Sequence, residues 1–325
     1  MAKNNQFRQL WSEVKTQRFA PTERRIGRTW LEEFQRKEFE TGNLLEVFHE
    51  NTKLNRKRDI KETTSLLQFS ESPRYKYLQM NAPEYPHREK VDLPDPASVD
   101  VSLGTVVRNR RAKREMTGEP LTRQELSTFL YYTCGVTERR DVDVSGMGSP
   151  EDETAEQCLR AYPSGGGLYP VRPYLLITNP CEELDRGLYF YTPDKHALRV
   201  IKRDPELPER IEADSGLFRT FPGTANPVDA GVTLVLTAQF WRSMIKYGLR
   251  SYRLVLQESG HVAQNALLAA EGQGFAATPL STYNDDPLNE YLEVNGVDEA
   301  VVYSVAVGRD ASGRNGSANN RGENQ

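Results

Sequence analysis

The chain has 325 residues, of which 27% are charged and 37% are hydrophobic, and its formal net charge is −4 at pH 7. This length is enough to bury a large core and allows about two domains of ordinary size. No apolar run predicts a membrane span and residues 1–6 do not begin a signal peptide, so we expect a cytoplasmic protein. The acidic balance argues against a nucleic-acid-binding protein, because such proteins carry a basic face.

Three regions of the chain differ in composition. Residues 1–98 are polar and helix-prone and end in the proline-marked segment 93–96, so we interpret them as an N-terminal helical extension that ends in a linker. Residues 99–310 alternate strand-like and helix-like segments and form the predicted main domain. Residues 311–325 contain too few apolar side chains to bury surface, so they are predicted to be disordered.

The main domain is expected to contain both helices and strands. Apolar periodicity predicts helices over residues 122–132 and 258–271. The expected strands are 174–178, 187–191, 197–201, 232–237 and 300–307, with the second and third joined in a hairpin. The acidic, glycine-bearing residues 138–157 are expected to form a long loop, either a lid over a site or a disordered segment.

The segment 161–170, Ala-Tyr-Pro-Ser-Gly-Gly-Gly-Leu-Tyr-Pro, places three consecutive glycines before a buried strand. Glycine accepts backbone angles that other residues avoid, so the amides of this turn can close directly onto a flat ligand. The alternative is that the glycines only let the chain turn. The segment is neither a Walker loop nor a nucleophile elbow, because it lacks Gly-Lys-Ser/Thr and Ser164 follows a proline.

Five positive charges lie within residues 108–114, where a helix is expected to meet a turn. Arginine holds phosphate with a planar fork of donors, so two arginines beside a turn can clamp one phosphate monoester. The alternative is a solvated basic face, which composition alone does not exclude.

Several linked segments resemble the azoline dehydrogenases, nitroreductase-like flavoproteins that make thiazoles and oxazoles in ribosomally synthesised peptides. The segments are Arg-Arg-x-x-Arg at 110–114, Pro-Ser-Gly-Gly-Gly-Leu-Tyr-Pro at 163–170, Gly-Leu-Tyr-Phe-Tyr at 187–191 with His-Ala-Leu at 196–198, Lys-Tyr-Gly at 246–248, and Glu-Ser-Gly-His-Val-Ala-Gln-Asn at 258–265. The resemblance covers about residues 100–308, and more weakly 48–53. It implies an α+β fold with a central, mostly antiparallel sheet flanked by helices, and an FMN cofactor.

The resemblance also implies which residues bind the flavin. The candidates are Arg110, Arg111 and Arg114 for the phosphate region, Ser164, Gly165, Gly166 and Gly167 for the ring, Leu280 and Ser281 for its far edge, and, as weaker candidates, Gln264 and Arg309. The family pattern usually has Ser where Ala112 stands, so one phosphate contact is missing here. No metal site is expected, because the three cysteines lack His partners at metal-ligand spacing.

Lys246 and Tyr247 are the predicted catalytic pair, because the resembled dehydrogenases carry Lys-Tyr at this point. On sequence alone the pair would be interpreted as a surface feature. An azoline becomes an azole by losing a proton and a neighbouring hydride, so the protein must place a base beside a flavin that accepts the hydride. The apolar residues before Lys246 indicate partial desolvation, which lowers the pKa of an ammonium. Which of the two residues titrates, and whether the pair removes the proton or polarises the ring nitrogen, stays open.

The small residues of the helix at 258–271 have two interpretations. They either pack inside one monomer or, as in the resembled fold, lie at a homodimer interface with two flavin sites between the subunits. The expected partners are an azoline-containing precursor peptide and a cyclodehydratase. Two other functions stay open, namely a general nitro or quinone flavin reductase, which would not need Lys246 and Tyr247, and a non-catalytic peptide-binding scaffold for the cyclodehydratase.

The remaining reactive side chains are expected to have structural roles. None of the four histidines has an Asp/Ser or Cys partner at recognisable spacing, so we expect them to be structural or exposed. Cys158, near the glycine turn, is expected to be a small buried hydrophobic residue.

Overall fold

A computed structural model describes residues 48–49, 52–53, 78–79, 84–143, 154–182, 184–213, 216–219 and 223–311. The chain divides into two compact units, Met1–Asp59 and Ile60–Gln325. In the first unit, the Thr52 N–H donates to the Phe48 carbonyl at 3.0 Å. Most of the predicted N-terminal extension and of the predicted C-terminal tail lies outside the described residues. The predicted domain boundaries at residues 98–99 and 310–311 therefore stay predictions.

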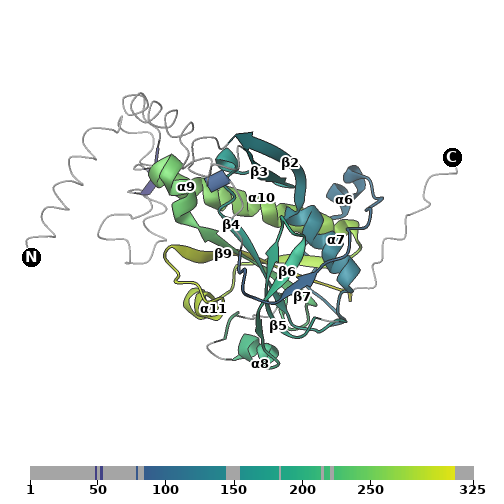
Figure 1. The fold of residues 1–325 in the computed structure, drawn as a ribbon. Helices are drawn as coiled ribbons and strands as arrows, with labels where there is room; N and C mark the ends of the chain where they lie inside the picture. Colours follow the sequence, from purple (N-terminus) through teal and green to yellow (C-terminus); the bar gives the residue numbers. More distant parts are fainter. Residues whose placement is uncertain are drawn as a thin grey trace, which may run out of the picture. The chain divides into compact units, whose positions relative to one another are not determined.

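The second unit is built on a seven-stranded sheet in the spatial order β1-β6-β5-β4-β7-β9-β8 (Figure 1). Every neighbouring pair of strands is antiparallel. The strands are β1 (Lys90–Asp92), β4 (Val171–Ile177), β5 (Gly187–Thr192), β6 (Ala197–Arg203), β7 (Val232–Gln239), β8 (Ala276–Leu280) and β9 (Glu299–Gly308). The predicted hairpin is the β5–β6 pair, and the α+β fold is confirmed.

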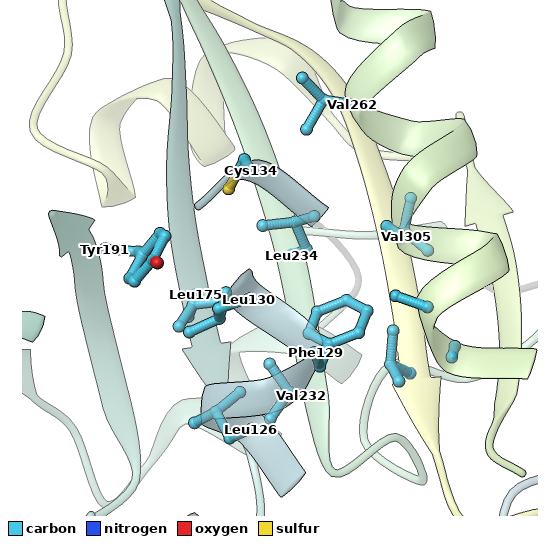
Figure 2. Close-up of a cluster of buried hydrophobic side chains, with 14 of the residues drawn as sticks. Leu126, Phe129, Leu130, Cys134, Leu175, Tyr191, Val232, Leu234, Val262 and Val305 are labelled. Atoms are coloured by element: carbon cyan, nitrogen blue, oxygen red, sulfur yellow. The ribbon is translucent and has the colours of Figure 1, made fainter. Parts of the chain in front are cut away.

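The sheet is covered on both faces, which is why its central strands are almost continuously apolar. Along β4, Leu175 and Ile177 point into one hydrophobic cluster, whereas Tyr174 and Leu176 point into the other. This alternation follows from the two-residue period of a strand. Figure 2 shows the first cluster, in which α7 and α10 lie over the sheet.

The helices are α6 (Leu103–Asn109), α7 (Arg123–Cys134), α8 (Leu207–Glu212), α9 (Phe240–Tyr247), α10 (Ser251–Gly272) and α11 (Asp285–Tyr291). The predicted helix at 122–132 is α7, which begins with a capping box between Thr122 and Glu125. The predicted helix at 258–271 lies within the longer α10. No helix in the described part of the chain is long and apolar enough to cross a bilayer.

The small residues of α10 pack inside this chain. Ala263, Ala266 and Ala270 are buried in the first hydrophobic cluster, where their short side chains let the helix approach the sheet closely. Another part of the helix surface is accessible, with His261 and Gln264 exposed, and at Gly260 an added Cβ would meet no atom within 4 Å. A surface of α10 that a second copy could contact therefore does not include Ala266.

The expectation of a long loop at residues 138–157 was wrong for residues 138–143 and 154–157, and residues 144–153 lie outside the described part of the chain. Strands β2 (Val136–Asp143) and β3 (Thr154–Arg160) pair as an antiparallel hairpin apart from the main sheet. The hairpin is rich in charge because its side chains reach solvent, where Arg139 and Arg140 form ion pairs with Glu156 and Glu138. Acidic composition therefore indicated exposure correctly, but it did not indicate a loss of strand structure.

The proline-marked segment at residues 93–96 is held to the main domain and is not a free linker. The Ser127 hydroxyl donates to the Pro94 carbonyl at 2.5 Å, and the Gln124 amide donates to the Asp95 carbonyl at 2.7 Å, both from α7. Prolines lack the N–H that a strand needs, but their carbonyls still accept hydrogen bonds. His196, which bonds to Ser127 at 2.7 Å, takes the structural role that was predicted for it.

Candidate active site

The glycine turn forms a short 3-10 turn over Gly165–Gly167, directly before β4. Gly166 and Gly167 have φ angles of +70° and +65°, in the left-handed region that L side chains rarely adopt. A Cβ on Gly167 would also lie 2.8 Å from the side-chain nitrogen of Gln157. The predicted need for glycine is confirmed at these two positions.

A buried carboxylate that the sequence analysis did not assign fixes this turn. The Ser164 hydroxyl donates to Glu258 Oε2 at 2.8 Å and accepts from the Tyr169 N–H, also at 2.8 Å. Glu258 lies in α10 and is only 4% exposed. Burial raises the pKa of Glu258 to about 7, although the Ser164 hydrogen bond and the Arg160 charge oppose the shift.

One feature of the sequence could have identified Glu258 as a buried, functional carboxylate, namely its position on α10. It lies one helical turn from Val255 and from Val262, on the apolar side of the helix, where an acidic residue needs a polar partner. Its second oxygen, Oε1, is buried and has no hydrogen-bond partner among the described residues. The partner of Oε2, Ser164, is 94 residues away, so the sequence could not identify it.

The catalytic candidates lie against the glycine turn. Lys246 and Tyr247 are the last two residues of α9, and a Cβ on Gly165 would lie 3.5 Å from the Tyr247 ring. The Lys246 ammonium lies 5.4 Å from the centroid of that ring. The structure therefore brings Lys246, Tyr247 and the glycine turn together. We call residues 164–167 with Lys246 and Tyr247 the glycine-turn group.

The apolar residues that were expected to desolvate Lys246 do not cover it among the residues that the structure describes. The apolar side chains before it point to solvent, with Met244 and Ile245 each 50% exposed and Trp241 38% exposed. Lys246 itself is only partly buried. Any exclusion of water from this lysine must come from something that covers α9.

The predicted phosphate ligands follow α6. The Arg110 N–H caps this helix by donating to the Val106 carbonyl, and Arg111 Nη1 donates to the carbonyls of Arg108 and Arg110 at 2.9 and 2.8 Å. Arg114 is exposed. These arginines flank Lys113, whose ammonium forms ion pairs with Glu271 at 3.3 Å and with Asp310 at 3.2 Å. The charge of Lys113 is already neutralised by these two carboxylates. In this segment, a phosphate would therefore be bound by the positive charges of the arginines and not by that of Lys113.

The other flavin candidates occupy different surroundings. Leu280 ends β8 and is buried, whereas Ser281 and Gln264 are exposed. Arg309 follows β9, and its guanidinium makes a bidentate ion pair with Glu125, with both N–O distances at 2.7 Å. A phosphate at Arg309 would have to compete with that carboxylate. The flavin-binding roles of all four residues stay predictions. We call Arg110, Arg111 and Arg114, with Arg309, the arginine group.

The two groups are connected to opposite ends of α10. Glu258 holds the glycine turn, and Glu271 holds Lys113 beside the arginine group. At about 1.5 Å per residue, these two anchors are about 20 Å apart along the helix. Figure 1 shows α10 running between α9 at one end and α6 at the other, in agreement with its packing contacts. The structure thus places the glycine-turn group and the arginine group at two separate points along α10, and Gln264, Leu280 and Ser281 belong to neither group.

Three curated proteins are similar to this chain. The putative nitroreductase MJ1384 of Methanocaldococcus jannaschii is 29% identical over 63% of this chain and 90% of its own length. The trifolitoxin-processing protein TfxB of Rhizobium leguminosarum bv. trifolii is 30% identical over 47% of this chain and 36% of its own length. The microcin B17-processing protein McbC of Escherichia coli is 29% identical over 44% of this chain and 50% of its own length. The matches to the two processing proteins therefore span half of those proteins or less.

A similar solved structure is that of a putative nitroreductase from Ralstonia eutropha JMP134. It has a TM-score of 0.52 and 24% identity, and it covers 72% of this chain and 94% of that chain, which shows a shared fold. The Nitroreductase family matches residues 107–309, a range that contains both groups of site residues. Because this match covers more than half of the chain, the protein belongs to the nitroreductase family.

Proposed function

We propose that this protein is an FMN-dependent dehydrogenase that oxidises thiazolines or oxazolines in a peptide to thiazoles or oxazoles. The observation that carries the proposal is the placement of Tyr247 against Gly165, with the Lys246 ammonium 5.4 Å from the centroid of the Tyr247 ring, which sets a pair able to handle a proton beside a turn able to receive a flat ring. Similarity to two proteins named for peptide processing supports a peptide substrate. Similarity to azoline dehydrogenases in the Lys-Tyr-Gly segment supports the reaction.

The residues present fit a flavin mononucleotide. The left-handed angles of Gly166 and Gly167 allow backbone amides to approach a planar ligand, and no side chain at these positions blocks it. Three arginines beyond α6 supply charged donors for one phosphate. The chain lacks a dinucleotide fingerprint, which favours FMN over FAD.

When bound, a flavin supplies the hydride acceptor that no amino acid provides. The remaining task of the protein is to remove the proton from the neighbouring ring carbon of the azoline. Lys246 performs this task if its neutral amine accepts the proton, and otherwise its ammonium polarises the ring nitrogen by donating a hydrogen bond. Tyr247, which packs against Gly165, positions its hydroxyl for the same proton. Loss of one proton and one hydride leaves the aromatic azole.

Ser164 and Glu258 have a positioning role in this scheme. The Ser164 hydroxyl donates to Glu258 and accepts from the Tyr169 N–H, so its only hydrogen is already used within the protein. The bond fixes the turn to α10, and the turn contacts Tyr247. A rigid turn keeps the proton-handling pair at a fixed position relative to the site of the flavin ring.

We further propose that each flavin is shared by two copies of the chain. One copy would supply the arginine group and the other the glycine-turn group, because within one chain these groups are anchored about 20 Å apart along α10. The apolar side chains on α9, the following turn and the start of α10 form an exposed patch that a second copy would cover: Trp241, Met244, Ile245, Leu249, Tyr252 and Leu256. Such a contact would also exclude water from Lys246.

The proposed partners follow from the similarity to the two peptide-processing proteins and to azoline dehydrogenases. The substrate would be a precursor peptide in which a cyclodehydratase has already formed azolines, so the two enzymes would act in sequence on one peptide. Mass spectrometry of a cyclodehydrated peptide tests the proposal, because each oxidation removes two hydrogens. The native protein should perform this conversion, and Lys246→Ala should not.

A second candidate function is a general nitro or quinone flavin reductase. It is favoured by the match to a putative nitroreductase along 90% of that protein's length. This function requires NAD(P)H and does not require the Lys-Tyr pair. Rapid turnover of nitroaromatic compounds that is unaffected by Lys246→Ala, without oxidation of any azoline peptide, would support it over the dehydrogenase.

A further inference from the structure

A pocket behind the glycine turn is lined by three arginines that the flavin assignment does not use. Arg160 ends β3, Arg172 lies in β4 and Arg242 lies in α9, and the acidic residues Glu84 and Asp194 line the same pocket. Arg242 ties the pocket to the turn, because its Nε donates at 3.0 Å to the carbonyl of the residue that follows Gly167.

The positive charge of Arg172 is already compensated. This side chain is 8% exposed, and its guanidinium forms ion pairs with Glu299 at 2.6 Å and with Glu84. The Nε atom of Arg172 is nevertheless buried and has no hydrogen-bond partner in the described part of the chain. The Nε–H of Arg172 therefore lacks an acceptor among the described residues, although the charge of this guanidinium is balanced.

Arg160 and Arg242 have only neutral partners. Arg160 donates to the Tyr162 hydroxyl at 3.2 Å, and its guanidinium lies 4.7 Å from the centroid of the Tyr169 ring. Arg242 donates to two backbone carbonyls, and neither arginine forms an ion pair with any residue that the structure describes. The Nε atom of Arg160 is buried and likewise lacks a hydrogen-bond partner among those residues.

The three guanidinium groups also act on one another. Burial lowers the pKa of Arg242, and the charges of Arg160 and Arg172 act in the same direction, against the attraction of Glu84. Partly buried like charges are unfavourable unless an anion joins them. Arg172 is neutralised by Glu84 and Glu299, whereas Arg160 and Arg242 have no carboxylate within ion-pair distance among the described residues, so an anion in the pocket would pair with these two.

We propose that this pocket binds a carboxylate of the peptide substrate, held by Arg160 and Arg242. A carboxylate matches the fork of donors on arginine and would give Arg160 and Arg242 the ionic partner that neither has among the described residues. Arg242 and Tyr169 line the pocket and Arg242 bonds to the carbonyl that directly follows the glycine turn, so a bound carboxylate would anchor the peptide close to the turn that contacts Tyr247. Assigning the carboxylate to the peptide rests on the proposed function, whereas the binding of a carboxylate does not.

Fluorescence anisotropy with unreactive product peptides tests the proposal. The probe is a labelled peptide with one thiazole, prepared with Glu or Gln at each flanking position and with a C-terminal carboxylate or amide. In the FMN-loaded native protein, one acidic form should bind at least about tenfold more tightly than its neutral counterpart. The position of the preferred acid distinguishes a side chain from the C-terminus. Equal binding of all the acidic and neutral forms would overturn the proposal.

Variants connect this preference to the pocket. Arg242→Gln and Arg160→Gln should remove the preference for the acidic peptide, and Arg242→Lys, which keeps the charge, should restore part of it. Arg203→Gln is the matched control, because Arg203 is an exposed arginine paired with Glu89 and Asp185 elsewhere on the sheet. A preference that persists in both Arg160→Gln and Arg242→Gln would contradict the proposal.

The same variants distinguish this proposal from the proposed function. If the native protein keeps an Arg242-dependent preference for the acidic peptide but oxidises no azoline, the dehydrogenase function is wrong and the pocket assignment stands. If Arg242→Gln loses FMN while Arg110→Ala with Arg114→Ala retains it, the pocket serves the flavin phosphate and the carboxylate proposal is overturned.

Discussion

Glu258 Oε2 accepts the hydroxyl hydrogen of Ser164 at 2.8 Å, and this bond joins the glycine turn to the buried face of α10. The carboxyl group is buried in surroundings that disfavour its charge, and burial raises its pKa from 4.5 to about 7. The protonation state of Glu258 therefore changes near neutral pH, and the stability of the folded chain should change with it.

Glu258 should make the protein less stable as pH rises from about 4.5 to about 7. Over this range the folded chain binds more protons at Glu258 than the unfolded chain does, so the stabilising effect of protonation is complete below about pH 4.5 and lost above about pH 7. The contribution is up to about 3 kcal/mol in the free energy of unfolding. Glu258→Gln should flatten this part of the profile. Urea unfolding between pH 4.5 and 8 measures the effect, and parallel profiles for the two proteins would refute it.

Gly167→Ala should destabilise the turn and weaken flavin binding. The left-handed backbone angle costs a non-glycine residue about 1–2 kcal/mol, and the added Cβ would press on Gln157. Gly104→Ala is the control, since Gly104 lies in α6 and an added Cβ there meets no atom within 4 Å. Thermal unfolding and the absorbance of bound flavin report the two effects. Equal stability of the Gly167→Ala and native proteins would contradict the assigned role of this glycine.

Replacing Arg110 and Arg114 together by Ala should weaken FMN binding at least several-fold, because charge-assisted hydrogen bonds to the phosphate are lost. The double variant should be purified with less flavin, measured by absorbance after denaturation. Arg203→Gln, which removes one exposed arginine far from both groups in sequence, should retain full occupancy. Full occupancy in the double variant would mean that the phosphate binds elsewhere.

Mixing two impaired variants, at an FMN concentration too low to load the arginine variant, should restore activity if each flavin is shared by two chains. A chain with Arg110→Ala and Arg114→Ala lacks two residues of the arginine group, and a chain with Lys246→Ala lacks the lysine of the proton-handling pair. A mixed dimer has one site in which both groups are intact, so a statistical mixture should regain about one quarter of the native activity. No recovery, despite mixed dimers detected by native mass spectrometry, would place both groups of a site in one chain.

The same model predicts that Gly260→Arg disrupts assembly. Gly260 lies on the accessible side of α10, where a long charged side chain has room within the chain and would oppose close approach of a second copy. Ala266→Arg does not test assembly, because Ala266 is buried inside its own chain. Light scattering of the native and Gly260→Arg proteins measures assembly, and flavin absorbance measures the cofactor in each. A native protein that is monomeric with full flavin would contradict the shared site.

Local sequence patterns predicted most of the main sheet. Alternating apolar residues and β-branched residues predicted β5, β6, β7 and β9. These strands were predictable because their own side chains, and for β5 and β6 the tight turn between them, favour strand structure. The β2–β3 hairpin was missed because its charged residues satisfy one another on an exposed surface, which composition does not distinguish from a loop.

The candidate site was only partly predictable for a different reason. Residues 164–167, Lys246 and Tyr247 were identified individually, but their contact depends on how α9 packs. Glu258 and the pocket arginines were missed because their roles arise from burial and from partners far away in the sequence. The separation of the glycine-turn group from the arginine group depends on the length of α10 between its two anchors, which no motif encodes.

The most direct test of the proposed function is the oxidation of a cyclodehydrated precursor peptide by Lys246→Ala. Loss of a general base typically costs about 10²–10⁴-fold in rate, and the flavin spectrum should stay intact because Lys246 serves the proton and not the cofactor. Tyr247→Phe keeps the ring against Gly165 and deletes only the hydroxyl, which separates a proton role from a packing role. Mass spectrometry should show the loss of two hydrogens per heterocycle with the native protein and almost none with Lys246→Ala. Undiminished azole formation by flavin-loaded Lys246→Ala would contradict the mechanism.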